Sequence, residues 1–423
     1  MIIVKLLERP IAPTSDLPEQ APIAQSSSAF GRASWLTWWP VRDVLIPFIA
    51  TRLMLTVIGC LALAMFRDLP VNPVAWEIKG DGNIGAVTTH LSSRYYPPVN
   101  IWSRWDAAFF HSIAKGGYNY IPGERSNAAF FPGYPMAMRA VHAIVPRQTD
   151  LTWFVSGLLV SNAALIIGLC YLVRLVRLDT DHATAARAAF YALLFPTTFY
   201  FSAVYSESLF LAAVIASFYY ARKNRWLMAC ALAGLATLTR APGVFLALPL
   251  LLEYMRQRGY RLREIRPDLA AFALIPASLG GLLLYFHWSV GNMFAISDTQ
   301  AAWGNGWGHL SAPWRPYVRF FSRGFSPVET IDFIFAVSAL VFAVIALNRL
   351  RLSYGVYAVV GYWFITAWGA LDSAPRYVLP IFPIFIVLAL WGRNPIFDRF
   401  YVIGSTGLAA LFMLRFALWQ WGA

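Results

Sequence analysis

Two carboxylates and two arginines in an otherwise apolar chain carry the clearest chemical signal. Asp106 and Glu207 can each accept a proton, and Arg240 and Arg376 can each hold an anion. A guanidinium group binds two phosphate oxygens at once and stays charged at physiological pH. A carboxylate beside a hydroxyl group can act as its general base. These residues are therefore the candidate catalytic pair and the candidate phosphate-binding pair.

Each of these four residues also has a simpler structural interpretation. Asp106 lies in the first turn of a helical pattern that ends at Gly116-Gly117, and Glu207 opens an apolar helix. Either carboxylate could merely cap its helix or favour the helix dipole. Arg240 and Arg376 flank proline turns and could simply extend to a membrane interface. The residue types alone leave both interpretations open.

The composition indicates which elements must position these residues. The 423 residues are 58% hydrophobic and only 13% charged, whereas soluble domains carry about 25% charged residues. The chain is therefore predicted to be an integral, multi-pass membrane protein. Its net charge of +13 comes from Lys and Arg that recur in short loops between apolar spans, which is typical of cytoplasmic loops. We therefore expect membrane lipid around the chain and no nucleic-acid partner.

The apolar stretches predict an all-α bundle of roughly eleven transmembrane helices of ~20 residues each. Basic residues precede the first span and place the N-terminus in the cytoplasm. Arg52 lies within that span and should face protein rather than lipid. Residues 1–40 are expected to form a flexible cytoplasmic tail and residues 41–423 the transmembrane domain. The expected spans are residues 44–66, 151–176, 183–204, 208–220, 226–238, 244–255, 269–288, 331–347, 354–370, 378–391 and 401–419.

Two long loops are expected on the outer side, at residues 67–147 and 289–328. The first holds the helix around Asp106, whose amphipathic pattern predicts a position at the membrane surface. It also holds a short apolar piece, Phe130–Val145, which we interpret as an interfacial or re-entrant helix. If that piece crossed the membrane, the basic segment Arg174–Arg187 would fall outside, against the positive-inside bias. With this topology the four candidate residues lie at the outer ends of spans, as expected for a site at the outer membrane surface.

Separated segments around the candidate residues also form recognisable motifs. They are Trp105-Asp106 with Ile113-Ala114 and Gly117-Tyr118, Phe130-Phe131-Pro132-Gly133-Tyr134-Pro135, Pro196 to Tyr205-Ser206-Glu207, Thr239-Arg240-Ala241-Pro242-Gly243, and Pro375-Arg376-Tyr377. In this order they resemble the PIG-V family, the GPI mannosyltransferase 2-like proteins and their prokaryotic relatives, membrane glycosyltransferases of the GT-C fold. The resemblance covers most of residues 40–390. It departs after Asp106, where relatives often carry His or Trp followed by an aromatic residue and this chain has Phe109-Phe110, so no family role passes to His111.

The resemblance implies a GT-C-like glycosyltransferase of a prokaryotic plasma membrane. It would move a hexose, expected to be mannose, from a polyprenyl-phosphate donor to a glycolipid or glycoprotein acceptor, with inversion. The family's expected catalytic acid in the first outward loop matches Asp106, and Glu207 is the second catalytic candidate. Arg376 and Arg240 would bind the donor phosphate, so no metal or other cofactor is expected. Further substrate contacts are expected from Arg104, Trp105, Tyr205 and Tyr377.

Four alternatives remain at this point. Asp179-Thr180-Asp181 has a spacing that can hold a divalent cation for a nucleotide sugar, but Asp181 is also well placed to cap the next helix. The Trp- and Gly-rich segment 302–309 could stack on sugar rings or form an ordinary interfacial loop. A secondary transporter is disfavoured because such proteins use midplane sites and repeated halves. A lipid-oligosaccharide ligase of related architecture is the other enzyme alternative.

Overall fold

The computed structural model describes residues 38–66, 96–146, 149–303, 312–323, 326–367 and 371–420. Within these ranges the regular elements are helices and no strand occurs. Five helical segments are long and apolar enough to cross a membrane, whose hydrocarbon core is ~30 Å thick. The all-α polytopic class predicted from the sequence is thereby confirmed. These segments are η2 (Val41–Leu45) with α3 (Ile46–Met65), α8 (Asp150–Val176), η7 (Pro267–Ala273) with α13 (Leu274–Val290), α16 (Pro327–Arg349) and α20 (Pro395–Ala417).

The remaining helices of the bundle are shorter than a full crossing, so the predicted count of about eleven spans is not confirmed. The clearest difference is the expected span 183–204, which was wrong as a single helix. Phe195 is extended and Pro196 follows it, so the helix ends at Leu194, because proline disfavours the helical conformation of the residue before it. The shorter helices are α9 (His182–Leu194), α10 (Glu207–Arg222), α11 (Trp226–Thr239), α12 (Ala247–Gln257), α17 (Leu352–Thr366) and α19 (Pro383–Trp391).

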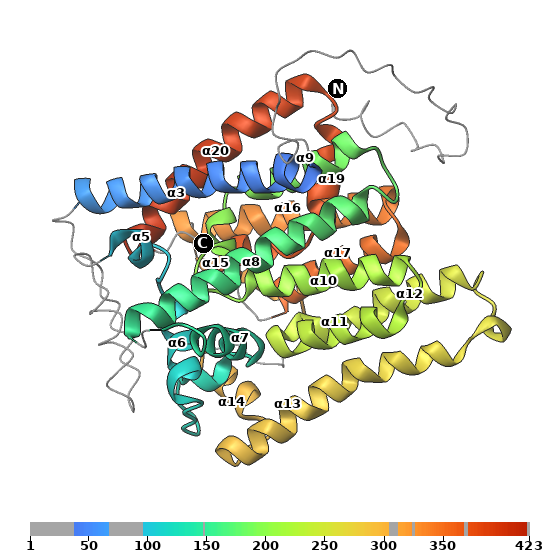
Figure 1. The fold of residues 1–423 in the computed structure, drawn as a ribbon, viewed down its shortest axis with the longest axis horizontal. Coiled ribbons are helices and arrows are strands. Elements are labelled where there is room, and N and C mark those ends of the chain that lie inside the picture. Colours follow the sequence, from blue (N-terminus) through green and yellow to red (C-terminus); the bar gives the residue numbers. More distant parts are fainter. Residues whose placement is uncertain are drawn as a thin grey trace.

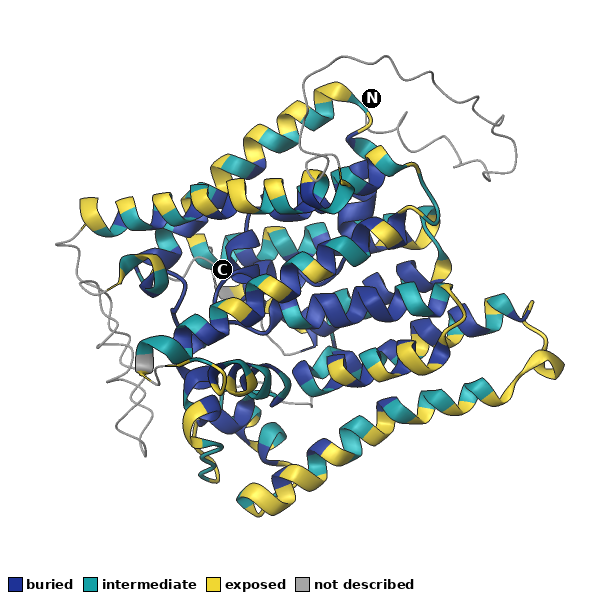
Figure 2. Cartoon of the chain, in the orientation of Figure 1, coloured by how far each residue is buried: buried dark blue, intermediate teal, exposed yellow. Residues whose placement is uncertain are grey.

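Helix α10 is the centre of the bundle and packs between α8 and α11 (Figure 1). It is buried along most of its length, whereas α3, α13 and α20 expose apolar side chains on the outside (Figure 2). In a bilayer those exposed faces contact lipid. Helices α8 and α10 approach so closely that a Cβ atom on Gly168 would lie 3.2 Å from the Cα of Ala212. Small residues permit this contact, as is usual where membrane helices meet.

The charged groups collect at the two ends of α10. At its last turn Arg222 pairs with Asp179 at 2.5 Å, and nearby Arg351 pairs with Glu253 at 3.0 Å. These residues belong to the segments that the basic pattern assigns to the cytoplasm. At its first residue lies Glu207, and sixteen helical residues separate the two ends by about 24 Å. Arg52 is likewise satisfied by protein, as expected, because it donates hydrogen bonds to the Leu193 and Thr198 carbonyls.

The first expected loop contains short helices packed against α8. Helix α6 (Ala107–Gly116) has seven of its ten residues buried, so most of its faces pack against protein, while its position at the membrane surface stays a prediction. Aromatic residues on several of its faces are covered by protein rather than by lipid. Helix α7 (Gly133–His142) has ten residues, about 15 Å of helix, too short to cross, in agreement with the interfacial interpretation of 130–145. Arg139 of α7 donates to the Ala114 carbonyl at 2.7 Å and ties the two helices together.

Several expected features fall outside the described residues. Most of the predicted tail does, as do residues 67–95 of the first loop and 304–311 of the second. Within the second loop, α14 (Ala295–Ala302) leads to Trp303, whose ring contacts that of Phe109 at 5.6 Å. Helix α15 (Arg315–Arg323) follows, and the short helix α18 (Ala374–Val378) precedes α19.

Candidate active site

Asp106, Arg376, Glu207 and Arg240 form one continuous chain of ion pairs. Arg376 donates its Nη1 to Oδ2 of Asp106 and its Nε to Oε1 of Glu207. Arg240 donates its Nη1 to the same Glu207 oxygen at 2.5 Å. The Asp106 and Arg376 positions are 270 residues apart in the sequence. The structure therefore brings together all four residues that the sequence singled out for catalysis and phosphate binding.

Four helix ends position these side chains. Asp106 precedes α6, Glu207 is the first residue of α10, Arg240 follows the last residue of α11, and Arg376 lies in α18. The capping interpretation of Asp106 is not supported, because its side chain accepts no hydrogen bond from the start of α6. Gly243 is required nearby, since a Cβ atom there would lie 2.3 Å from the α11 backbone. This close approach fixes the turn that carries Arg240.

The two carboxylates differ in their access to solvent. The Asp106 side chain is 21% exposed, whereas that of Glu207 is completely buried. Among the described residues, Oε2 of Glu207 has no hydrogen-bond partner. A buried carboxylate shared by two guanidinium groups is suited to holding those groups in place. The exposed carboxylate is the one that a substrate hydroxyl group can reach.

Both arginines lie against aromatic rings. Burial lowers the pKa of the Arg376 guanidinium, but the charges of Glu207 and Asp106 outweigh burial and hold that pKa well above its ordinary value. The Arg376 guanidinium lies 4.4 Å from the ring centre of Tyr205, and that of Arg240 lies 5.3 Å from the ring centre of Tyr377. Each ring face attracts the cation beside it.

Three of the predicted substrate contacts, Arg104, Trp105 and Tyr205, are buried beside Asp106. The Tyr205 hydroxyl donates to the Arg104 carbonyl at 3.0 Å and accepts from the Asp106 backbone N–H at 3.3 Å. The Arg104 side chain donates to the Ala417 carbonyl at 3.1 Å. Trp105 adopts a left-handed backbone conformation with φ of 50°. Direct contact of Arg104, Trp105 and Tyr205 with substrate stays a prediction.

An apolar groove begins at Arg240 and Tyr377, the fourth predicted substrate contact. Arg240 donates hydrogen bonds to Ser206 and Glu207 through Nη1 alone, and its Nε and Nη2 make none to any described residue. A guanidinium with unused donors therefore lies at the polar end of a groove that is otherwise hydrophobic. The groove is lined further by Phe210, Pro242, Tyr357, Val360, Gly361, Phe364, Pro380 and Ile381.

The competing Asp179-Thr180-Asp181 motif has a structural role at the opposite end of the bundle. Asp179 accepts two hydrogen bonds from Arg222, at 2.5 and 2.9 Å. Asp181 caps α9 by accepting from the Thr184 N–H at 2.8 Å. Burial raises the pKa of Asp181, but its hydrogen bonds with Thr184 and Arg393 outweigh burial and hold that pKa at about 2. No group of three His, Cys, Asp or Glu side chains in the described ranges has a metal-binding arrangement.

The sequence analysis missed two residues beside the site and one further acid. The ring centre of Tyr200 lies 5.7 Å from the Arg376 guanidinium, and the Ser206 hydroxyl accepts from Arg240 at 3.2 Å. Asp332 is buried within α16. An ionisable residue inside an apolar span indicates function by default, and that signal was available for Asp332.

The ion-pair chain predicts unequal effects on stability. Changing Glu207 to Gln leaves two buried guanidinium groups without their shared charge and should lower the free energy of unfolding by about 3 kcal/mol. Changing Asp106 to Asn at the exposed end should lower it by less than about 1 kcal/mol. Unfolding of the purified variants in detergent checks both values. A larger loss for Asp106→Asn than for Glu207→Gln would contradict the assignment of Glu207 as the central anchor.

Comparisons with known proteins bear on this site. A region of 155 residues is 32% identical to GPI alpha-1,6-mannosyltransferase 2 of Cricetulus griseus, and the match covers 34% of this chain and 29% of that protein. The Archaeoglobus fulgidus oligosaccharyltransferase in its apo form has 12% identity and a TM-score of 0.43, over 88% of this chain and 56% of that one. Its complex with zinc and sulfate has 14% identity and a TM-score of 0.41, over 80% and 52%. Similarity at this level transfers no residue role.

The family comparison is more extensive. The family described as Mannosyltransferase (PIG-V) matches residues 73–287, just over half of the 423 residues. The matched region contains Asp106, Glu207 and Arg240, while Arg376 lies beyond it. The resemblance predicted from the motifs is confirmed. The chain therefore belongs to the PIG-V mannosyltransferase family.

Proposed function

We propose that this protein transfers mannose from a polyprenyl phosphate to a glycolipid or glycoprotein acceptor at the outer face of a prokaryotic plasma membrane. Family membership supports sugar transfer by a membrane protein. The observation that supports a lipid-phosphate donor is the apolar groove that ends at Arg240, next to the ion-pair chain. The lipid chain would lie along this apolar surface while its phosphate meets the guanidinium groups.

Both arginines have N–H groups available to bind such a phosphate. Nε and Nη2 of Arg240 and Nη2 of Arg376 make no hydrogen bond to described residues. Their planar groups match phosphate oxygens bidentately. The incoming phosphate also competes with Asp106 for Arg376. Donor binding therefore releases the Asp106 carboxylate from its ion pair.

The reaction then follows from the released carboxylate. Asp106 takes the proton from an acceptor hydroxyl group as the acceptor oxygen forms a bond to the anomeric carbon. The bond from that carbon to the phosphate oxygen breaks, and its electron pair leaves with the polyprenyl phosphate. Arg376 and Arg240 stabilise the leaving phosphate. One displacement of this kind inverts the configuration at the sugar carbon.

The membrane face is inferred from the distribution of charge. The site lies at the end of α10 opposite the cluster around Arg222 and Arg351. Basic segments remain in the cytoplasm in most membrane proteins, so the N-terminus would be cytoplasmic and the site external. A transporter is disfavoured because the charged groups lie at helix ends rather than at midplane breaks.

Asp106→Asn should lower turnover by about 10²-fold or more, because asparagine keeps the size of the side chain and cannot accept the proton. The measurement is transfer of labelled mannose from mannosyl polyprenyl phosphate to a membrane glycolipid extract by purified protein. The folded fraction of the variant, followed by size-exclusion chromatography, should match wild type. Near-normal turnover would exclude Asp106 as the base and make Glu207 the candidate.

Arg376→Lys should raise the apparent KM for the polyprenyl donor and lower kcat, since lysine keeps the charge and loses the planar fork. Wild-type activity should survive EDTA because arginine meets the phosphate charge. The same assay, run with and without chelator and with a nucleotide sugar as the alternative donor, checks both. Transfer from the nucleotide sugar and not from the lipid donor would overturn the proposed donor class.

Val360→Trp should raise the KM for the polyprenyl donor by about 10-fold, because the larger side chain fills the apolar groove. The matched control is Val359→Trp, since Val359 is 38% exposed and does not line the groove. A short-chain donor of one or two isoprene units should be affected less than the full-length donor. Equal effects of the two substitutions on both donors would refute the groove as the lipid site.

A further inference from the structure

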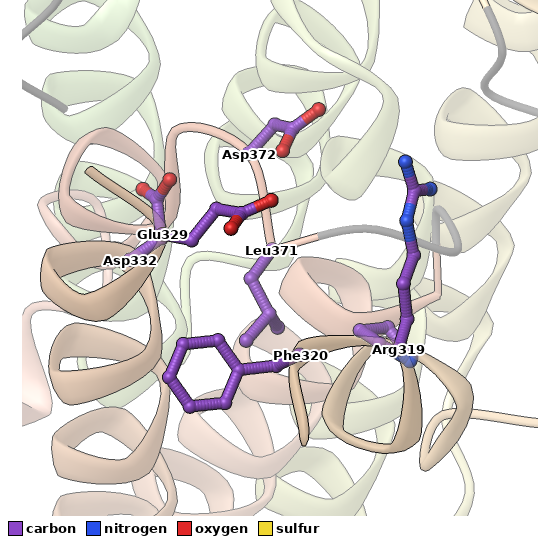
Figure 3. A pocket seen from close by; sticks show the side chains of 7 residues that line it. Arg319, Phe320, Glu329, Asp332, Leu371 and Asp372 are labelled. Atoms are coloured by element: carbon purple, nitrogen blue, oxygen red, sulfur yellow. The ribbon is translucent and has the colours of Figure 1, made fainter. Parts of the chain in front are cut away.

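A polar cavity, distinct from the apolar groove at Arg240, lies beside the segment that carries Arg376. Figure 3 shows the carboxyl groups of Glu329, Asp332 and Asp372 on one side, with the Arg319 guanidinium opposite them. Phe320 and Leu371 supply its apolar surface. The cavity is thus formed by α15, by the first turns of α16 and by the residues just before α18.

Asp332 is the buried polar residue of this cavity. Its side chain is 2% exposed and lines the cavity. Within the described part of the chain, its Oδ1 atom has no hydrogen-bond partner. The carboxyl group also faces the backbone N–H groups of Ser373 and Ala374. A buried carboxylate oxygen without a partner is unfavourable unless a hydrogen-bond donor enters the cavity.

The other polar groups limit which kinds of ligand the cavity can bind. Glu329 is partly satisfied, because its Oε2 accepts from the Ser326 hydroxyl at 3.0 Å. Asp372 and Arg319 are exposed at the rim. Three carboxyl groups against one guanidinium disfavour a phosphate. No described side chains form a metal-ligand set, and Arg319 would repel an ammonium group. A sugar hydroxyl both donates and accepts hydrogen bonds, so it suits a lining that contains both acceptors and a donor.

The cavity lies against the start of α18, the helix that carries Arg376. Asp332 faces the backbone N–H groups of Ser373 and Ala374, and α16 packs against α18. Asp372 is four residues before Arg376 in the sequence. In the proposed function the groove at Arg240 holds the lipid-phosphate donor. This cavity is therefore available to the molecule that receives the sugar.

We propose that the cavity binds a neutral sugar residue of the acceptor. Asp332 and Asp372 accept hydrogen bonds from its hydroxyl groups, Arg319 donates to them, and Phe320 contacts an apolar edge of the sugar ring. The inference rests on the proposed glycosyl transfer, because the acceptor is defined by that reaction. The inference adds that the protein recognises a neutral sugar in its acceptor.

Kinetics with the acceptor and donor varied separately test the assignment. Asp372→Asn and Arg319→Gln should each raise the KM for the glycolipid extract about 10-fold, because each removes one rim contact to a hydroxyl group. The donor KM and kcat should stay within about twofold of wild type, as for the control Glu264→Gln in an exposed turn on the cytoplasmic side. Asp332→Asn should have a larger effect, and the two rim variants keep the test valid if this buried variant fails to fold. A rise in donor KM instead, or no rise in either, would overturn the acceptor assignment.

A binding measurement separates this inference from the reaction itself. Saturation-transfer NMR with methyl α-D-mannopyranoside should detect binding to wild type and to Asp106→Asn, and binding should be lost in Asp372→Asn. That pattern supports the sugar site even if transfer from the polyprenyl donor is not observed. Binding of glucosamine or of Mg²⁺ that depends on Asp372, without binding of the mannoside, would overturn the proposed ligand class.

Discussion

The arrangement of the site depends on one buried carboxylate that binds two arginines. Charged side chains inside a membrane bundle are tolerated only when they are paired. Glu207 is fully buried and accepts hydrogen bonds from both Arg240 and Arg376 through the same oxygen. The ends of α10 and α11 and the short helix α18 must therefore meet within hydrogen-bonding distance. With Asp106 at the outer end, two positive and two negative charges balance before any substrate arrives.

This balance of charges bears on the order of donor binding and proton transfer. A carboxylate held by a guanidinium is a weaker base than one released from it. Asp106 is both the exposed member of the chain and the one bound to Arg376. A donor phosphate that takes its place on Arg376 would release the carboxylate only when the donor is present. The same exchange leaves Glu207 undisturbed, because burial and its bond to Arg240 hold it.

The sequence identified the charged residues, which are rare in this apolar chain. It did not show which helix faces pack against protein. Asp106, Glu207, Arg240 and Arg376 could be found because charges at the ends of apolar spans stand out. Local periodicity could not show that the aromatic faces of α6 are covered by protein. Nor could it reveal that Arg104 binds the carbonyl of Ala417, a contact across 313 residues. The break after α9 was readable from Pro196, yet hydrophobicity alone extended the predicted span across it.

The short central helices determine where the site lies relative to the end of α8. Helices α10, α11 and α17 have 16, 14 and 15 residues, which span about 24, 21 and 22 Å. Each falls short of a hydrocarbon core ~30 Å thick, whereas α8 has 27 residues and extends further. The ends of α10 and α11 that carry Glu207 and Arg240 therefore stop short of the end of α8. In the proposed function, a lipid-linked phosphate at the boundary between hydrocarbon and headgroups would meet the paired arginines at these helix ends without drawing the lipid chain out of the membrane.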